Sequence, residues 1–193
     1  MNELATLEQA VRDLYASKNP HRANWADWLV ANHVFVVADY AEQLAQNLNA
    51  NVTLARAAAV LHDIADASMS RFDENHEQAS LTIARTMLQE AGFSESDITL
   101  VVDDAIRYHS CHDGESPESI EGKILATADS MAHLQSDFYI FAAWAFGRDS
   151  SLETYKQWAS EKLERDFKNK ILFDDVREEC RNTYEALKRL INP

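Results

Sequence analysis

Six residues in the first two-thirds of the chain have side chains of the types that bind divalent metal ions. They are His33, His62, Asp63, His76, His109 and Asp129. Imidazole nitrogens and carboxylate oxygens are common ligands of metals such as Zn2+, Fe2+ and Mn2+. Because the six residues lie in separate segments, a site formed from them has to be assembled by folding. The first hypothesis is therefore a metal site built from several helices.

The strongest local signal is the pair His62 and Asp63, which interrupts an apolar run. The run comprises residues 57–61, and Ile64 follows the pair. Each polar side chain in a buried helix needs a partner, because desolvation without one costs on the order of several kcal/mol. A shared metal ion is one such partner. Taken alone, the pair also fits a hydrogen-bonded histidine beside a helix carboxylate, so further ligands decide between the two interpretations.

Two more residues are predicted to face the same interior. His33 shares an i, i+4 stripe with the apolar residues of an expected helix over residues 24–48. Asp129 follows the apolar run at residues 124–126, which indicates an inward carboxylate. Three helices then deliver four ligands.

An all-α fold of about eight or nine helices is predicted. Apolar residues recur at helical spacing, and only four Gly and three Pro interrupt them. Capping signatures are expected at Thr6 with Gln9, Asn75 with Gln78 and Ser150 with Glu153, with Pro117 opening a helix capped by Ser116. The expected helices cover residues 6–17, 24–48, 54–66, 75–92 and 94–109, then a helix from 117 that carries Asp129, then helices with breaks at Gly147 and Asn169.

Length and composition limit the possible functions. At 193 residues the chain is expected to form a single domain over residues 1–193. The net charge of −14 disfavours a general nucleic-acid binder but leaves a small phosphorylated substrate open, since a bound cation can dominate the local field. Two cysteines, no signal peptide and no long apolar run predict a cytoplasmic protein without a membrane span.

The pattern of His33, then His62 with Asp63, then Asp129 resembles the HD-domain superfamily of metal-dependent phosphohydrolases. The segments ANHVFVVADYAEQLA, LARAAAVLHDIAD and EGKILATADSM look like the three motif-bearing helices of that family, in the same order. The resemblance covers about residues 24–135, and it implies an HD-domain-like helical bundle. Residues 136–193 are then expected to pack on this core as C-terminal helices.

The resemblance implies one or two divalent ions, with Mn2+, Mg2+, Fe2+, Co2+, Ni2+ and Zn2+ all open. In family members with two metals, the Asp of the doublet bridges both ions, and later histidines join the second. His76 and His109 occupy similar places here, and His112 is a further candidate. The alternatives are an exposed first-turn histidine for His76 and a polar-loop residue for His112.

The chain departs from the family in the residues that follow the doublet. Many members continue with Ile-Gly-Lys, whereas this chain has Ile64, Ala65 and Asp66. Asp66 is interpreted either as a catalytic residue, which orients an imidazole or accepts a proton from metal-bound water, or as an exposed helix-end acid. Asp63, Asp66 and His109 form the predicted catalytic set.

Candidate substrate-binding residues are the basic side chains near the predicted ligands. Each of them also fits an ordinary salt bridge or a core position. They are Lys123, Arg107, Arg71 and His133. Aromatic residues after His133 fit a substrate pocket, core packing or a homodimer interface.

The functional hypothesis is hydrolysis of a phosphate ester of a small molecule by metal-activated water, with a nucleotide as one candidate substrate. Monoester and diester cleavage are both open. Two alternatives belong to other classes: a di-iron oxygenase on the same fold, and a regulatory module without catalysis. The complete ligand set disfavours the module, because a scaffold has no need of four buried polar side chains.

Overall fold

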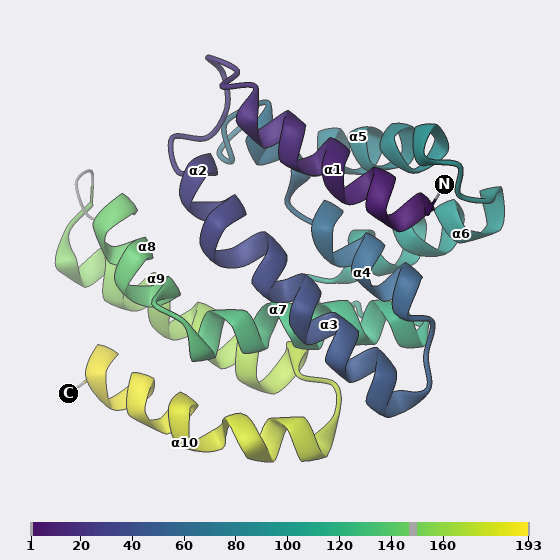
Figure 1. Cartoon of the computed structure of the whole chain (residues 1–193). Coiled ribbons are helices and arrows are strands. Elements are labelled where there is room, and N and C mark those ends of the chain that lie inside the picture. The colour runs from purple at the N-terminus through teal and green to yellow at the C-terminus, as the bar shows by residue number, and fades with distance from the viewer. Residues whose placement is uncertain (1, 147–149, 193) are drawn as a thin grey trace.

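The computed structural model describes residues 2–146 and 150–192, and these residues form helices and connecting loops without a strand (Figure 1). Segments that run into one another give nine helices within the described residues, as the sequence predicts. They are α1 (Glu3–Ala16), α2 with η1 and α3 (Ala26–Leu29, Val30–Val34, Phe35–Leu48), α4 (Val52–Leu61), α5 (His76–Ala91), α6 with η3 (Glu95–Thr99, Leu100–Ile106), α7 (Ile120–Gln135), α8 (Phe138–Phe146), α9 with η4 (Leu152–Arg165, Asp166–Lys170) and α10 (Asp174–Ile191), besides a short 3-10 turn, η2 (Ile64–Ala67).

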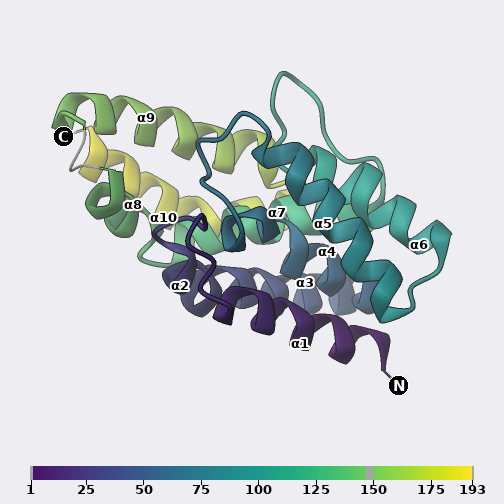
Figure 2. The same ribbon diagram turned by 90° about the horizontal axis from the view of Figure 1, so that it is seen from above.

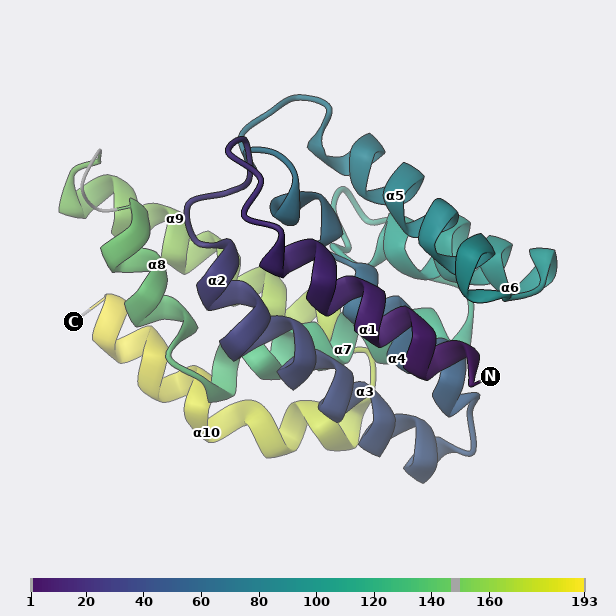
Figure 3. The same ribbon diagram turned by 45° about the horizontal axis from the view of Figure 1, so that its top comes forward.

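Helix α7 is the centre of the molecule. Its side chains from Glu121 to Leu134 are buried with the exception of Lys123, which is the pattern of a helix covered on all sides. It packs against α3, α4, η3, η4 and α10. Figures 1, 2 and 3 all show α5 and α6 at one end of the molecule and α8 and α9 at the other, with α7 between them.

A buried hydroxyl group on α7 forms hydrogen bonds with the segment that leads into the last helix. Thr127 Oγ1 donates a hydrogen bond to the carbonyl of Lys170 at 3.3 Å and accepts one from the backbone N–H of Leu172 at 3.1 Å. Thr127 has no exposed surface. The chain therefore turns from η4 toward α10 against the middle of α7, which positions Lys170 beside the interior.

Helix starts differ from the prediction at three places. Helix α1 begins after Asn2 rather than at Thr6, α7 is capped by Ser119 rather than Ser116, and α9 is capped by Ser151 rather than Ser150. A run with several serines offers several possible caps, and a contact distant in sequence selects one at α7. There, the carboxylate of Asp104 accepts hydrogen bonds from the backbone N–H groups of residues 118 and 119. The predicted break at Gly147 lies outside the described residues.

Three helices widen locally to π-helical geometry next to buried polar side chains. η1 contains His33, η3 ends three residues before His109, and η4 contains Lys170. Such segments are rare in proteins and frequently occur at functional sites. No described helix is both long and apolar enough to cross a membrane.

Gly122 is required by close packing at the start of α7. A Cβ atom at this position would lie 2.5 Å from Pro117 Cβ. We expect Gly122→Ala to lower the free energy of unfolding by about 1–3 kcal/mol, because overpacking outweighs the helix preference of alanine. Urea denaturation measures the change. The neighbouring Lys123→Ala is the control and should change stability by less than about 0.5 kcal/mol; an unchanged or raised stability of Gly122→Ala contradicts the prediction.

Candidate metal centre

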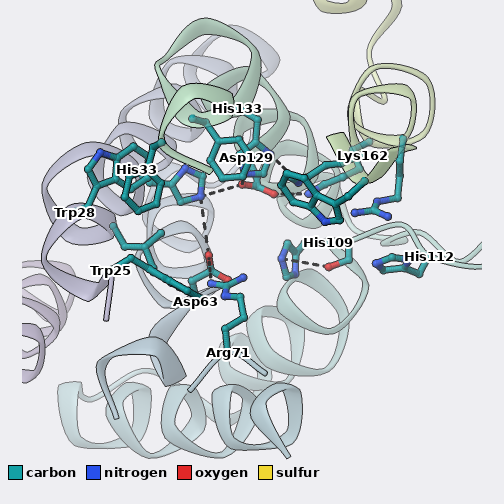
Figure 4. A pocket seen from close by; sticks show the side chains of 17 residues that line it. Trp25, Trp28, His33, Asp63, Arg71, His109, His112, Asp129, His133 and Lys162 are labelled. Atoms are coloured by element: carbon teal, nitrogen blue, oxygen red, sulfur yellow. Dashed lines mark hydrogen bonds and ion pairs between the residues drawn. The ribbon is translucent and has the colours of Figure 1, made fainter. Parts of the chain in front are cut away.

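Ligand atoms from three helices meet in the interior. His33 on η1, His62 at the end of α4 and Asp129 on α7 bring one nitrogen or oxygen each within 4.8 Å of one another, and all three residues are buried. His33 Nε2 lies 3.1 Å from Asp129 Oδ1 and 3.3 Å from His62 Nε2. Figure 4 shows His33 and Asp129 facing each other across this point.

Asp63 completes a set of four. Its Oδ2 atom lies 3.5 Å from His62 Nε2 and 4.0 Å from His33 Nε2. The N-terminal segment holds the backbone here, because the hydroxyl of Tyr15 donates a hydrogen bond to the carbonyl of Asp63 at 3.0 Å. The structure thus brings together the four residues of the predicted motif.

Hydrogen bonds to the backbone orient two of the imidazole rings. His62 Nδ1 lies 2.7 Å from the carbonyl oxygen of Ala59, and His109 Nδ1 lies 2.6 Å from that of Ile106. A carbonyl accepts only, so each Nδ1 carries the proton and donates it. The Nε2 atom of each ring then presents a lone pair, which is the arrangement that metal-binding histidines adopt.

The donor set fits a divalent metal ion. Asp129 Oδ1 is buried and has no hydrogen-bond donor in suitable geometry among the described residues. The His62 Nε2 lone pair and the carboxylate of Asp63 face the same point. Two imidazoles and two carboxylates suit Mn2+, Fe2+ or Zn2+. These residues would therefore hold the ion.

Both carboxylates are kept ionised. Burial opposes the charge on Asp63, but the adjacent guanidinium of Arg71 outweighs it and holds the pKa of Asp63 well below the ordinary value. Burial likewise opposes the charge on Asp129, and His133 and Lys170 hold its pKa well below the ordinary value. Charged carboxylates are the form that binds metal.

Asp66, Arg71 and His76 form a group beside this cluster. Asp66 is fully buried, which excludes the interpretation as an exposed helix-end acid. It pairs with Arg71 and lies 3.3 Å from His76 Nε2. The carboxylate of Asp66 thus lies against Arg71 and His76, and its backbone N–H donates a hydrogen bond to the carbonyl of Asp63 at 3.1 Å.

The remaining predicted residues are spread over two cavities. The first cavity, of about 240 Å3, is lined by His33, Asp63, Asp129 and His133. The second cavity, of about 470 Å3, is lined by His62, His76 and Arg107 among others. Asp63, Arg71, His109, Ser110 and His112 line both.

His109 reaches the cluster, whereas Lys123 does not. The ring of His109 lies edge-on to that of His62, with 5.4 Å between the ring centres. Burial and the charge of Lys170 lower the pKa of His109 to about 3, so its imidazole is neutral at pH 7. Lys123 lines a different surface hollow with Asp103 and Asp104 and touches neither of the two cavities.

The sequence gives no signal for three residues of the C-terminal helices that join the site. Lys170 is 3% exposed and pairs with Asp129 Oδ2. Asp166 is fully buried, 3.2 Å from His133 Nδ1, and accepts a hydrogen bond from Tyr139 at 3.0 Å. Lys162 lies 3.3 Å from both His133 Nδ1 and Asp166. Charged residues on an amphipathic helix are ordinarily solvated, so nothing in the sequence marks these as buried.

Comparison with known proteins decides the family. A family model of the HD domain matches residues 30–134, more than half of the chain. The chain belongs to the HD-domain superfamily of metal-dependent phosphohydrolases. The match confirms the resemblance seen in the sequence, and it ends before the C-terminal helices that carry Lys162, Asp166 and Lys170.

Two HD-domain relatives define how far the likeness extends. Ribonuclease Y 1 of Pediococcus pentosaceus is 31% identical over 182 residues, which are 89% of this chain but only 30% of that protein. A crystal structure described as a predicted HD superfamily hydrolase, from an uncultured Thermotogales bacterium, is similar with a TM-score of 0.59. It is 22% identical, and the match covers 96% of this chain and 87% of the other. At this identity the likeness shows the fold alone.

The buried His133 makes the metal-free protein sensitive to acid. Burial lowers the pKa of His133 to about 4, although Asp129 and Asp166 favour its protonated form. Below about pH 6.5 the unfolded chain binds a proton that the folded chain does not, so the free energy of unfolding falls as the pH falls toward 4. This residue accounts for about 2 kcal/mol between pH 7 and pH 4.5.

We therefore expect His133→Gln to reduce the loss of stability on acidification by that amount. Urea denaturation of the chelator-treated protein at several pH values measures it. The control is His21→Gln, in an exposed loop, which should leave the pH dependence unchanged. A His133→Gln variant with the same pH dependence as the original protein contradicts the assignment.

Proposed function

We propose that this HD domain hydrolyses a phosphate ester of a small molecule, and that a nucleotide is the substrate class to test first. The proposal is carried by one observation: the first cavity has metal ligands, basic side chains and aromatic rings on its walls. A phosphate group, its counter-charges and a flat ring each have a matching surface there. Ionised carboxylates face the same cavity, so the phosphate needs a cation between itself and Asp63 and Asp129.

The basic wall comes from the C-terminal helices. Lys162, Arg165 and Lys170 line the cavity. Arg165 Nε is buried and has no hydrogen-bond partner among the described residues. Because a guanidinium binds phosphate oxygens through a planar fork, Arg165 is the strongest candidate for a phosphate contact. Lys162 and Lys170 are held by Asp166 and Asp129 and add fixed positive charge.

Aromatic side chains of α2, α8 and α9 also line this cavity. Trp28 stacks on Phe141 with 3.7 Å between ring centres and an interplanar angle of 3°. Trp25, Phe138 and Trp158 line the same cavity. Flat apolar surfaces of this kind favour a substrate with a ring, such as a nucleobase. The volume of about 240 Å3 favours a small molecule.

The ion, when bound, supplies an acidified water and a positive charge for the phosphoryl oxygens. The residues of this chain orient it and the substrate. His33, His62, Asp63 and Asp129 fix the position of the ion. His133 lies 3.3 Å from Asp129 Oδ1 through Nε2 and is held by Asp166 through Nδ1, so its ring is fixed at the cavity wall.

A long RNA substrate is disfavoured for this chain, although the relative from Pediococcus is named a ribonuclease. That name belongs to a protein more than three times as long as the matched region. The net charge of −14 repels a polynucleotide over most of the surface. A short phosphorylated molecule needs only the basic wall of the cavity.

Replacing Asp63 tests the proposed function. We expect Asp63→Ala to lose the bound metal and to lower phosphate release by at least about 1,000-fold, because the ion loses a charged ligand and its fixed position. Elemental analysis measures the metal. Turnover with Mn2+ or Mg2+ is measured on mononucleotides, cyclic nucleotides, sugar phosphates and a generic aryl phosphate.

The matched control is Asp39→Ala, an exposed carboxylate on α3 that pairs with Arg56. It should keep both metal and turnover. Full activity of Asp63→Ala would remove the proposed site from consideration. Metal retention without phosphate release from any ester would favour a regulatory module, and two irons with oxygen consumption would favour an oxygenase.

A further inference from the structure

We infer that the site holds a single metal ion. The guanidinium of Arg71 supplies the second positive charge of the site, at the position beside Asp63 where a second metal ion would bind. The number of metal ions does not depend on the proposed function; only the role of these charges in phosphate ester hydrolysis does. The sequence leaves open whether His76 and His109 complete a second metal site.

The clustered donors are sufficient for one ion. Among residues 2–146 and 150–192, His33, His62 and Asp129 form the single group of three ligand side chains whose atoms lie within 4.8 Å of one another. Asp63 Oδ2 adds a fourth ligand from the side. His76 and His109 join no comparable group within these residues. The described side chains therefore provide a cluster of ligands for one metal ion and no comparable cluster for a second.

Arg71 occupies the outer side of Asp63. Its Nη2 atom lies 2.7 Å from Asp63 Oδ2, the oxygen that also faces the histidines. The same Nη2 atom pairs with Asp66 Oδ2. A positive charge thus sits between two buried carboxylates, and Figure 4 shows Arg71 reaching up to Asp63 from below.

Both oxygens of Asp66 are engaged by Arg71. Its Oδ1 accepts a hydrogen bond from Arg71 Nε at 3.2 Å and lies 3.3 Å from His76 Nε2, while Oδ2 accepts the Nη2 bond. The pairing is bidentate, which is the geometry that guanidinium and carboxylate groups form best. His76, predicted as a ligand of the second ion, faces this ion pair instead.

The guanidinium is held as a permanent charge. An arginine side chain does not lose its proton in proteins, and Arg71 has the carboxylates of Asp63 and Asp66 as counter-charges. The backbone around it is fixed, since Ala23 N–H donates to the carbonyl of Asp66 at 2.9 Å. The arginine side chain keeps 35% of its surface exposed and lines both cavities. It therefore delivers positive charge to the cavities without a metal.

Counting bound Mn2+ tests this directly, in the chelator-treated chain of 193 residues titrated with Mn2+. Equilibrium dialysis and native mass spectrometry give the count, and electron paramagnetic resonance separates an isolated ion from a coupled pair. We expect one isolated Mn2+ per chain in the original protein. Arg71→Ala should bind two, the second more weakly, because Asp63 and Asp66 then lack a counter-charge. Arg71→Lys keeps the charge and should bind one.

Arg85→Ala is the matched control. Arg85 is 33% exposed, pairs with Asp103 at 2.6 Å and Glu95 at 3.6 Å, and lines neither cavity. It should bind one ion. Two ions in the original protein, or a folded Arg71→Ala variant that binds any number other than two, would overturn the inference. If Arg71→Ala does not fold by circular dichroism, the count in the original protein decides alone.

The outcome is independent of the proposed hydrolysis. One ion per chain with no phosphate release from any ester leaves the metal and guanidinium arrangement standing and removes the function. Two ions with rapid phosphate release does the reverse.

Discussion

The carboxylates of Asp63 and Asp129 are buried side by side, and the charged groups of the interior are arranged around them. Each has an oxygen within 4.0 Å of the same nitrogen, His33 Nε2. Two like charges in a poorly solvated interior are strongly unfavourable unless cations and hydrogen bonds compensate them. Arg71 and Lys170 supply two of these cations, one on each carboxylate. The space between the carboxylates and the histidines is suited to a third, the metal ion.

The C-terminal helices contribute to the compensation of these carboxylate charges. Thr127 fixes the turn after η4 and so aims Lys170 at Asp129. Asp166 holds His133 and Lys162 in turn. These residues lie beyond the region that the HD-domain model matches, residues 30–134. The proposed metal ligands lie within the matched region, and the C-terminal helices of this chain supply most of the positive charge around the cavity.

The fold class and the ligand cluster can be predicted from the sequence because each leaves a strong local pattern. Helical periodicity fixes the fold class, and the unpaired polar character of His62 and Asp63 in an apolar run marks the interior site. Helix caps were predicted less well: Ser116 and Ser119 are equivalent locally, and the distant Asp104 selects between them. The pairing of Lys170 with Asp129 spans 41 residues and leaves no local pattern. Lys123 is close to Asp129 in the sequence, which alone suggests that it lies near the site. Its side chain instead lines the surface hollow that contains Asp103 and Asp104.

His33, His62, Asp63 and Asp129 are the proposed ligands of a catalytic metal ion beside the first cavity. Anomalous diffraction from crystals grown with Mn2+, collected near the manganese absorption edge, locates the ion. We expect one peak per chain, within coordination distance of His33 Nε2, His62 Nε2 and the two carboxylates. A peak elsewhere, or no peak in crystals whose protein is fully ordered at this site, would rule out this metal site.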